Sequence, residues 1–247
     1  MKTIFFINKN LNYGRKYISR YCKSVFENSS KTQIVVDIGS GTGVDLSNIS
    51  KLNKNCELHA IDHKKNKKLV DLFKNKGILK IHSINIEREK LPFENETVDI
   101  IIVNQILEHC KEVFWIFHEI SRVLKVNGVV IIGVPNLASL HNRILLLLGK
   151  QPSCININSA HIRGFTFDGT NSFLNKNFPN GYQLKMFNGS NFYPFPFYLS
   201  EIFSWLFPKL SVGIFFKYEK KLKYNNSFLI GSDKLDTNYF LGKDKLN

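Results

Sequence analysis

The residues best suited to bind a ligand follow an apolar stretch, where one acid precedes three glycines at alternate positions in the segment IVVDIGSGTG, residues 34–43. Glycine adopts positive φ readily, and without a Cβ it lets a ligand approach the backbone closely. A buried strand that runs into such a turn predicts a site for a nucleotide-type ligand. The predicted contacts are Asp37, Gly39, Ser40, Gly41 and Gly43.

The glycine spacing has to be tested against more than one kind of nucleotide cofactor. A dinucleotide fingerprint, G-x-G-x-x-G, would need its third glycine at position 44, which is Val44. A dehydrogenase is therefore the weaker interpretation. Asp62 stands 19 residues after Gly43, at the end of the next predicted strand, where it would accept hydrogen bonds from a ribose hydroxyl pair. Its alternative role is to cap a helix that starts at Lys64.

Alternating strands and helices would position these residues. Apolar runs predict strands over residues 34–38, 57–61, 78–84, 98–103 and 129–134. Helical periodicity predicts a leading helix over 17–26, then helices from 44, over 64–76 and over 113–124, the last ended by Asn127-Gly128. Further helices over 137–148 and 168–177 and strands over 182–187 and 212–218 complete the pattern. The fold class is therefore α/β: a single Rossmann-like, doubly wound, mostly parallel seven-stranded sheet with helices on both faces.

The chain divides into three predicted parts. Residues 1–33 form an N-terminal helical cap, 34–220 one domain, and 221–247 a polar tail. Within the domain, 34–136 would bind the cofactor and 137–220 would face the substrate. The patch Asn12-Tyr13-Gly14-Arg15 is either an ordinary helix-entry loop or a segment that folds over the cofactor.

The composition limits the partners, metals and cell compartment that we expect for this protein. The formal charge of +14 would suggest a polyanionic partner, but 28 of the 34 basic residues are lysine and 27 residues are asparagine. This looks like compositional bias and disfavours nucleic acid. Single, widely spaced cysteines at 22, 56, 110 and 154 show no zinc pattern, so no metal is predicted. The start lacks a signal peptide and the apolar runs are short, which indicates a cytoplasmic protein.

Several motifs in order carry a family resemblance: VVDIGSGTG, HAID, NIEREKLPFENETVDIIIVNQILEHC and VNGVVIIGVPN. Over residues 34–136 the chain resembles the class I S-adenosylmethionine-dependent methyltransferases (methyltransferase domain 11/23-like). The resemblance implies S-adenosyl-L-methionine as cofactor. It implies that Asp37 and the backbone of Gly39 and Gly41 hold the methionine part. Asp62 would bind the ribose, Asn85 with Ile86 the adenine, and Asn104 and Gln105 would line the methyl-transfer face. His63 is also predicted to contact the cofactor. Many relatives have aspartate where this chain has Asn85, whose amide oxygen can still accept a hydrogen bond.

Methyl transfer mainly requires alignment of the acceptor, and sometimes removal of a proton. The candidate catalytic bases are His109 and His161, with Glu108 as a partner that would orient either ring. The segment over residues 134–152 also resembles methyltransferases of surface-polysaccharide and sugar modification, and a methyltransferase-like protein of bacterial methionine biosynthesis. By that resemblance, Asn136, His141 and Arg143 would shape the acceptor pocket; otherwise they are a helix start and surface residues.

The expected reaction is O-methylation of a small-molecule or glycan-like, saccharide acceptor. Two alternatives stay open: a regulatory partner that binds the cofactor on the same fold, and an RNA methyltransferase. The aromatic stretch over residues 191–207 is compatible with peripheral membrane contact, or with a core or lid. The oligomeric state is left open by the sequence.

Overall fold

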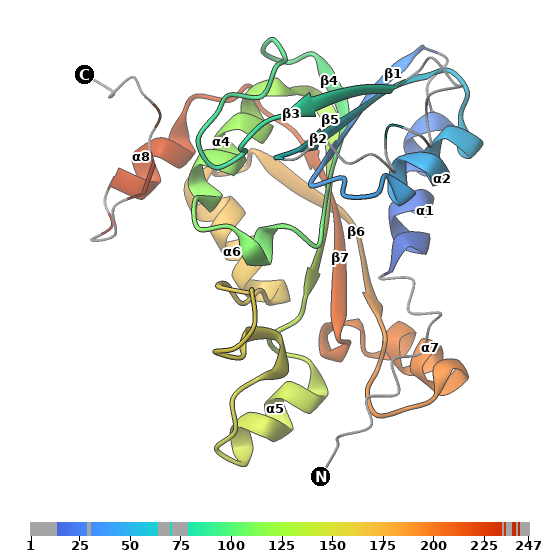
Figure 1. Ribbon diagram of the computed structural model, residues 1–247, viewed down its shortest axis with the longest axis vertical. Coiled ribbons are helices and arrows are strands. Elements are labelled where there is room, and N and C mark those ends of the chain that lie inside the picture. Colours follow the sequence, from blue (N-terminus) through green and yellow to red (C-terminus); the bar gives the residue numbers. More distant parts are fainter. Residues whose placement is uncertain are drawn as a thin grey trace.

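The computed structural model describes residues 14–28, 31–63, 70, 79–233, 235, 239–240 and 242 (Figure 1). Seven strands form one sheet in the order β3-β2-β1-β4-β5-β7-β6. The strands are β1 (Gln33–Ile38), β2 (Cys56–Asp62), β3 (Leu79–Ser83), β4 (Val98–Asn104), β5 (Leu124–Pro135), β6 (Tyr182–Ser190) and β7 (Gly213–Lys220). The labelled α-helices are α1 (Arg15–Phe26), α2 (Val44–Leu52), α4 (Val113–Val123), α5 (Leu140–Leu147), α6 (Phe167–Asn177), α7 (Phe197–Leu206) and α8 (Ser227–Asp233).

The sheet is mostly parallel, as predicted. β3, β2, β1, β4 and β5 run parallel, whereas β7 is antiparallel to both β5 and β6. Because the chain runs outward from β1 to β2 and then returns to β4, the strand order reverses between β1 and β4. A crevice outside the carboxyl ends of these strands is where an open α/β sheet binds its ligand.

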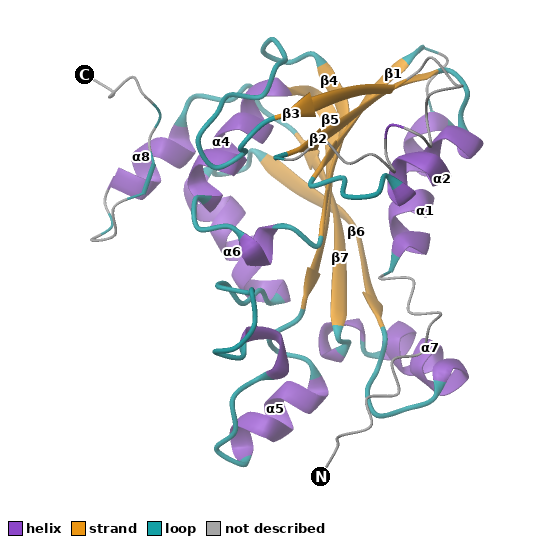
Figure 2. Ribbon diagram, viewed as in Figure 1, coloured by secondary structure: helices purple, strands orange, loops and turns teal. Residues whose placement is uncertain are grey.

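Helices cover both faces of the sheet, which confirms the predicted fold class (Figure 2). On one face, α2 packs against β2 and α1 packs against β5 and β7, through residues such as Leu46 of α2 and Tyr21 of α1, which are fully buried. On the other face, α4 and α6 cover β4 and β5, and α8 joins them through Phe228. The sheet is thus buried on both sides, as its almost wholly apolar central strands require.

One predicted boundary is wrong. The sequence predicts a helix that ends at Asn127-Gly128, but α4 ends at Val123 and β5 begins at Leu124. Asn127 has φ 66° and lies within β5. The strand register shifts there, because Val98 pairs with Leu124 and Ile100 with Val129. The Asn-Gly pair therefore marks an irregularity in a strand. The helix predicted over 64–76 lies outside the described residues, apart from position 70.

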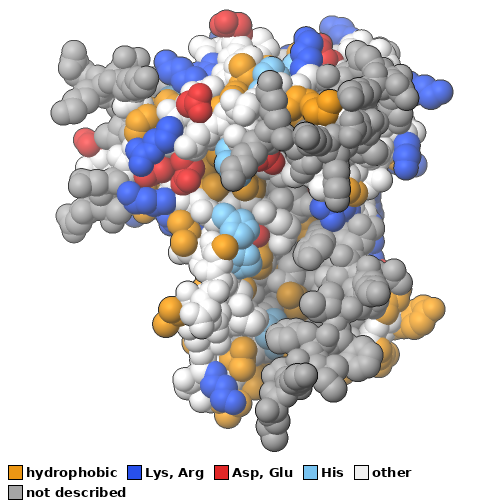
Figure 3. Space-filling view, in the orientation of Figure 1, with side chains coloured by type: hydrophobic (Ala, Val, Ile, Leu, Met, Phe, Trp, Pro, Cys, Tyr) orange, Lys and Arg blue, Asp and Glu red, His pale blue; other side chains and the backbone are white. Residues whose placement is uncertain are grey.

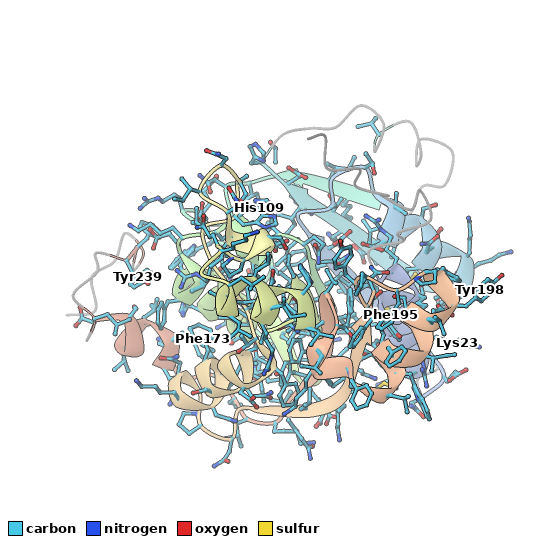
Figure 4. The ribbon with its side chains drawn as sticks, turned by 90° about the horizontal axis from the view of Figure 1, so that it is seen from below. Lys23, His109, Phe173, Phe195, Tyr198 and Tyr239 are labelled. Carbon is cyan, nitrogen blue, oxygen red and sulfur yellow. The ribbon has the colours of Figure 1, made fainter. Side chains whose placement is uncertain are left out.

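α5 and α7 lie near the carboxyl end of β5, away from the helices that sandwich the sheet (Figure 1). In the aromatic stretch, Phe192 is buried and packs on Phe203, whose ring stacks on Phe195 at 4.5 Å. Tyr198 and Trp205 on α7 are 81% and 74% exposed, and Figure 4 shows Tyr198 at the outer side of α7. Peripheral membrane contact by this segment stays a prediction.

Among the helices that the structure describes, none is both long enough and apolar enough to span a bilayer.

Candidate functional site

In the glycine turn after β1, Gly39 and Gly41 both have the positive φ that favours glycine, but their surroundings differ. Gly39 has φ 74°, and a Cβ added there would lie 2.8 Å from Cγ1 of Ile106. Gly41 has φ 52°, but a Cβ there would meet no atom within 4 Å. Packing against the loop after β4 therefore accounts for Gly39. Gly41 instead borders open space, which a bound ligand can fill.

Asp62 ties the end of β2 to this turn. Its Oδ2 accepts a hydrogen bond from the backbone N–H of Gly41 at 2.9 Å. Its Oδ1 lies 3.1 Å from Nδ1 of His63, whose side chain is exposed. The structure therefore brings the predicted residues Asp62 and His63 to the glycine turn, since the carboxyl ends of β1 and β2 are neighbours.

A buried polar group lies beneath the turn. Asp37 on β1 is 3% exposed, and burial, followed by the charge of Asp45, raises its pKa well above the ordinary aspartate value. Asp45 on α2 accepts a hydrogen bond from Nδ2 of Asn104 at 3.0 Å, and its Oδ1 lies 3.2 Å from Nε of Arg15. Two predicted cofactor residues, Asp37 and Asn104, thus share one site with Asp45 and Arg15. The sequence analysis did not predict these last two residues as ligands.

Two atoms at this edge of the sheet lack hydrogen-bond partners within the described part of the chain. They are Oγ of Ser40 and Oδ1 of Asn104, and both are buried. Such atoms cost free energy unless a ligand or water satisfies them. Gln105, the next residue after Asn104, has φ 55°, a conformation uncommon for residues other than glycine. Buried carboxylates, unpaired polar atoms and open space at Gly41 fit a polar nucleoside cofactor with a cationic group.

The predicted adenine contacts follow β3. Oδ1 of Asn85 accepts a hydrogen bond from the backbone N–H of Glu87 at 3.0 Å, which shapes the local turn. A carbonyl oxygen has a second lone pair, so this bond leaves room for a second donor. Ile86 is half-buried and packs against the core. The adenine roles of Asn85 and Ile86 stay predictions.

The structure brings together the two histidines predicted as catalytic. His109 ends the short helix η1 (Leu107–His109) after β4, and His161 lies on the loop between α5 and α6. Their ring centroids are 4.6 Å apart in an edge-to-face arrangement. The backbone carbonyl of Glu108 accepts the N–H of Ile162 at 2.8 Å and so joins the two segments. Figure 3 shows histidines gathered at the middle of one face, and Figure 4 shows His109 beside the yellow segment that follows α5.

The predicted acceptor-pocket residues have partners within the protein. Asn136 is 1% exposed, and its Nδ2 donates to the carbonyls of Lys209 and Ser211. Nε2 of His141 lies 2.7 Å from Oγ of Ser153. Nε of Arg143 donates to the carbonyl of Ala138 at 2.8 Å. These contacts hold the start of α5 in place, and an acceptor role for the three residues stays a prediction.

Arg15 and Asp45 are the site residues that sequence reasoning missed as ligands. Asp45 stands two residues after the last glycine of the turn, and Arg15 belongs to the patch that was considered as a fold-over segment. Gly14 and Arg15 open α1 beside the turn, but Asn12 and Tyr13 lie outside the described residues.

Solved structures of methyltransferases share this fold. The CurJ carbon methyltransferase aligns with a TM-score of 0.60 at 16% identity, over 84% of this chain and 54% of its own. The N-methyltransferase NodS of Bradyrhizobium japonicum WM9, in complex with S-adenosyl-L-homocysteine, aligns with a TM-score of 0.56 at 10% identity, over 86% and 89% of the two chains. The fold is therefore that of the class I S-adenosylmethionine-dependent methyltransferases.

Sequence comparison points to the same class. Residues 36–132 match the family model described as a methyltransferase domain. The malonyl-[acyl-carrier protein] O-methyltransferase of Marinomonas sp. (strain MWYL1) is 26% identical over 103 residues, which cover 41% of this chain and 38% of the relative. The match thus spans about two fifths of that curated relative. The resemblance seen in the motifs is confirmed: the chain carries a class I S-adenosylmethionine-dependent methyltransferase domain.

Proposed function

We propose that this chain transfers the methyl group of S-adenosyl-L-methionine to an oxygen of a small-molecule or saccharide acceptor. The observation that carries the proposal is the convergence of Asp37, the glycine turn, Asp62 and Asn104 at the carboxyl ends of adjacent strands, within the matched residues 36–132. The cofactor, when bound, supplies a methyl group already activated on a sulfonium.

Each residue has a role that its surroundings support. The buried carboxylate of Asp37 would pair with the ammonium of the methionine part, and the backbone at Gly41 would lie against the cofactor. Asp62 accepts a hydrogen bond from the turn, and its carboxylate at the end of β2 would bind the ribose hydroxyls. Asn104 has a buried oxygen without a partner among the described residues, and it would face the methyl-transfer side together with Gln105.

The acceptor would enter beside the group Glu108, His109 and His161. Glu108 and His109 follow the end of β4 at Asn104, and His161 contacts His109 from the loop between α5 and α6. His109 is exposed and His161 is half-buried. Alignment of an acceptor oxygen with the methyl carbon is the main requirement, since the leaving group is a neutral thioether. A polar group with imidazole nitrogens at this place is suited to orient a hydroxyl and to receive its proton.

Asp62→Ala is expected to weaken the binding of S-adenosyl-L-homocysteine about tenfold, because one charged acceptor of hydrogen bonds is lost, worth on the order of 1.5 kcal/mol. Isothermal titration calorimetry on the purified chain measures this. Asp168→Ala is the matched control, because Asp168 on α6 has a side chain that is 84% exposed. Absence of binding by the parent chain, or equal binding by Asp62→Ala, would contradict the proposal.

Mass spectrometry of metabolites and surface glycans from cells with and without the gene identifies the acceptor. A metabolite or glycan that loses one methyl group in cells without the gene supports the proposal. Tight cofactor binding with no methylated product and a co-purified enzyme would instead favour a regulatory partner. RNA binding that weakens steeply with salt would favour an RNA methyltransferase.

A further inference from the structure

Glu108, His109 and His161 each offer one ligand atom, and these atoms all lie within 4.8 Å of one another. The residues come from η1 and from a loop 52 positions further along the chain. We propose that these three side chains form a binding site for a divalent transition-metal ion, of which Zn²⁺ is the best fit. Two imidazole nitrogens and one carboxylate oxygen are a ligand set that zinc takes in catalytic sites, with a position left for water or substrate.

Both imidazoles are held in the tautomer that binds metal. Nδ1 of His109 lies 3.2 Å from the carbonyl oxygen of Ala160, and Nδ1 of His161 lies 2.7 Å from that of Cys154. A carbonyl oxygen can only accept, so each Nδ1 carries the proton and donates it. In the neutral form of each ring, Nε2 therefore has a free lone pair that can bind a metal ion. This arrangement, with a ring N–H bound to a backbone carbonyl, is the usual support of metal-binding histidines.

The buried carboxyl group of Glu108 is independent evidence for the metal site. Its side chain is 1% exposed, and its Oε2 has no hydrogen-bond partner within the described part of the chain. A buried carboxylate oxygen without a partner costs free energy, and a bound cation offsets that cost. The site thus has a place for positive charge.

The geometry requires only small adjustments. A tetrahedral ion about 2.1 Å from each ligand atom holds these atoms about 3.4 Å apart. His109 is exposed and His161 is half-buried, so small changes of their side-chain torsion angles can bring Nε2 closer to the carboxylate of Glu108 while each Nδ1 stays bound to its carbonyl. The remaining coordination position opens to the outside, where His109 is accessible.

The role of the ion rests on the proposed function. η1 begins two residues after Gln105, so the ion would lie on the acceptor side of the methyl-transfer face. A metal ion lowers the pKa of a hydroxyl that binds it. This favours an acceptor whose oxygen binds metal, such as a sugar or other hydroxyl. With the ion bound, both Nε2 atoms are occupied, so the O–H proton would pass to solvent instead of to His109 or His161. The O–C bond would form as the S–C bond breaks, and the S–C electron pair would stay on sulfur.

Titration of the metal-free full chain with Co²⁺, followed by visible absorption, tests the site, and Zn²⁺ is then added as a competitor. We expect one equivalent of Co²⁺ with ligand-field bands, displaced by Zn²⁺ but not by Mg²⁺. Glu108→Gln and His161→Gln should each lower the Co²⁺ affinity about 100-fold. His82→Gln, which changes a histidine on β3 outside this group, should leave the Co²⁺ affinity unchanged. Circular dichroism checks that each variant is folded.

Three results would each overturn the assignment. They are the absence of ligand-field bands, an unchanged Co²⁺ affinity in both Glu108→Gln and His161→Gln, and displacement of Co²⁺ by Mg²⁺ as readily as by Zn²⁺. The binding of S-adenosyl-L-homocysteine is measured on the same samples by calorimetry. If the chain binds S-adenosyl-L-homocysteine but does not bind Co²⁺ as expected, the metal site is contradicted and the proposed function is not. If it binds Co²⁺ as expected but does not bind S-adenosyl-L-homocysteine, the proposed function is contradicted and the metal site is not.

Discussion

Gly41→Ala is expected to weaken the binding of S-adenosyl-L-homocysteine at least 100-fold, about 2.7 kcal/mol. The backbone of Gly41 has φ 52°, and no protein atom lies within 4 Å of the position that a Cβ would take. The added methyl group would therefore enter the space that we assign to the cofactor. It would also strain the turn whose N–H binds Asp62. Calorimetric titration of the folded variant measures the loss.

Gly149→Ala is the matched control for Gly41→Ala. Gly149 has φ 67°, and a Cβ there also meets nothing within 4 Å, but it follows α5 far along the chain from the turn. The two variants share the backbone strain of about 1–2 kcal/mol that alanine suffers at positive φ. Both should lower the free energy of unfolding similarly, while Gly149→Ala keeps the parent affinity. Equal affinities for the two variants would show that the space at Gly41 is not the cofactor site.

The central sheet could be predicted from the sequence because its strands are buried on both faces. Runs such as VDIIIV over 98–103 are apolar at almost every position, and the glycine turn marks where the first strand ends. The boundary between α4 and β5 could not, because Asn127-Gly128 is a common helix end. In this chain the Asn-Gly pair lies within β5, at the place where its register with β4 shifts.

The site was predicted in part for the same physical reason. Residues at strand ends, such as Asp37, Asp62 and Asn104, follow from the sheet topology, because parallel strands bring their carboxyl ends together. The pairing of Asp45 with Arg15 depends on how α1 packs beside α2, which local sequence does not encode. The contact between His109 and His161 likewise depends on a long loop that folds back on η1. The sequence therefore does not predict the parts of the site in which residues far apart along the chain meet through tertiary packing.

The binding of S-adenosyl-L-methionine is expected to release a proton from Asp37. Burial raises the pKa of this carboxyl in the free protein, the charges of Asp45 and Asp62 raise it further, and Arg15 lowers it. Cys22, on α1, also interacts with Asp37, but burial raises the pKa of its thiol so far that it stays neutral. A bound ammonium favours the carboxylate, so the pKa in the complex is lower than in the free protein. Proton release accompanies binding wherever the pH lies between these two values.

The sign of the pH dependence follows from this difference. At low pH the free protein holds a proton on Asp37 that must leave, so the affinity rises with pH and levels off above the raised pKa of the free protein. The same raised pKa means that Asp37 lowers the stability of the free fold as pH rises from the ordinary aspartate value through the raised one. Calorimetry in two buffers of different ionisation enthalpy counts the protons released on binding.

Asp37→Asn keeps the shape of the side chain and removes its charge. We expect it to lower the affinity about 100-fold, since a buried charge pair is lost, and to abolish both the proton release and the rise of affinity with pH. Asp99→Asn is the control, because Asp99 lies on β4 away from its carboxyl end, where it binds Ile34 N–H and Lys125. It should keep the proton release. If Asp37→Asn released as many protons as the parent chain, Asp37 could not be the group that meets the cationic end of the cofactor, and that role would pass to its neighbour Asp45.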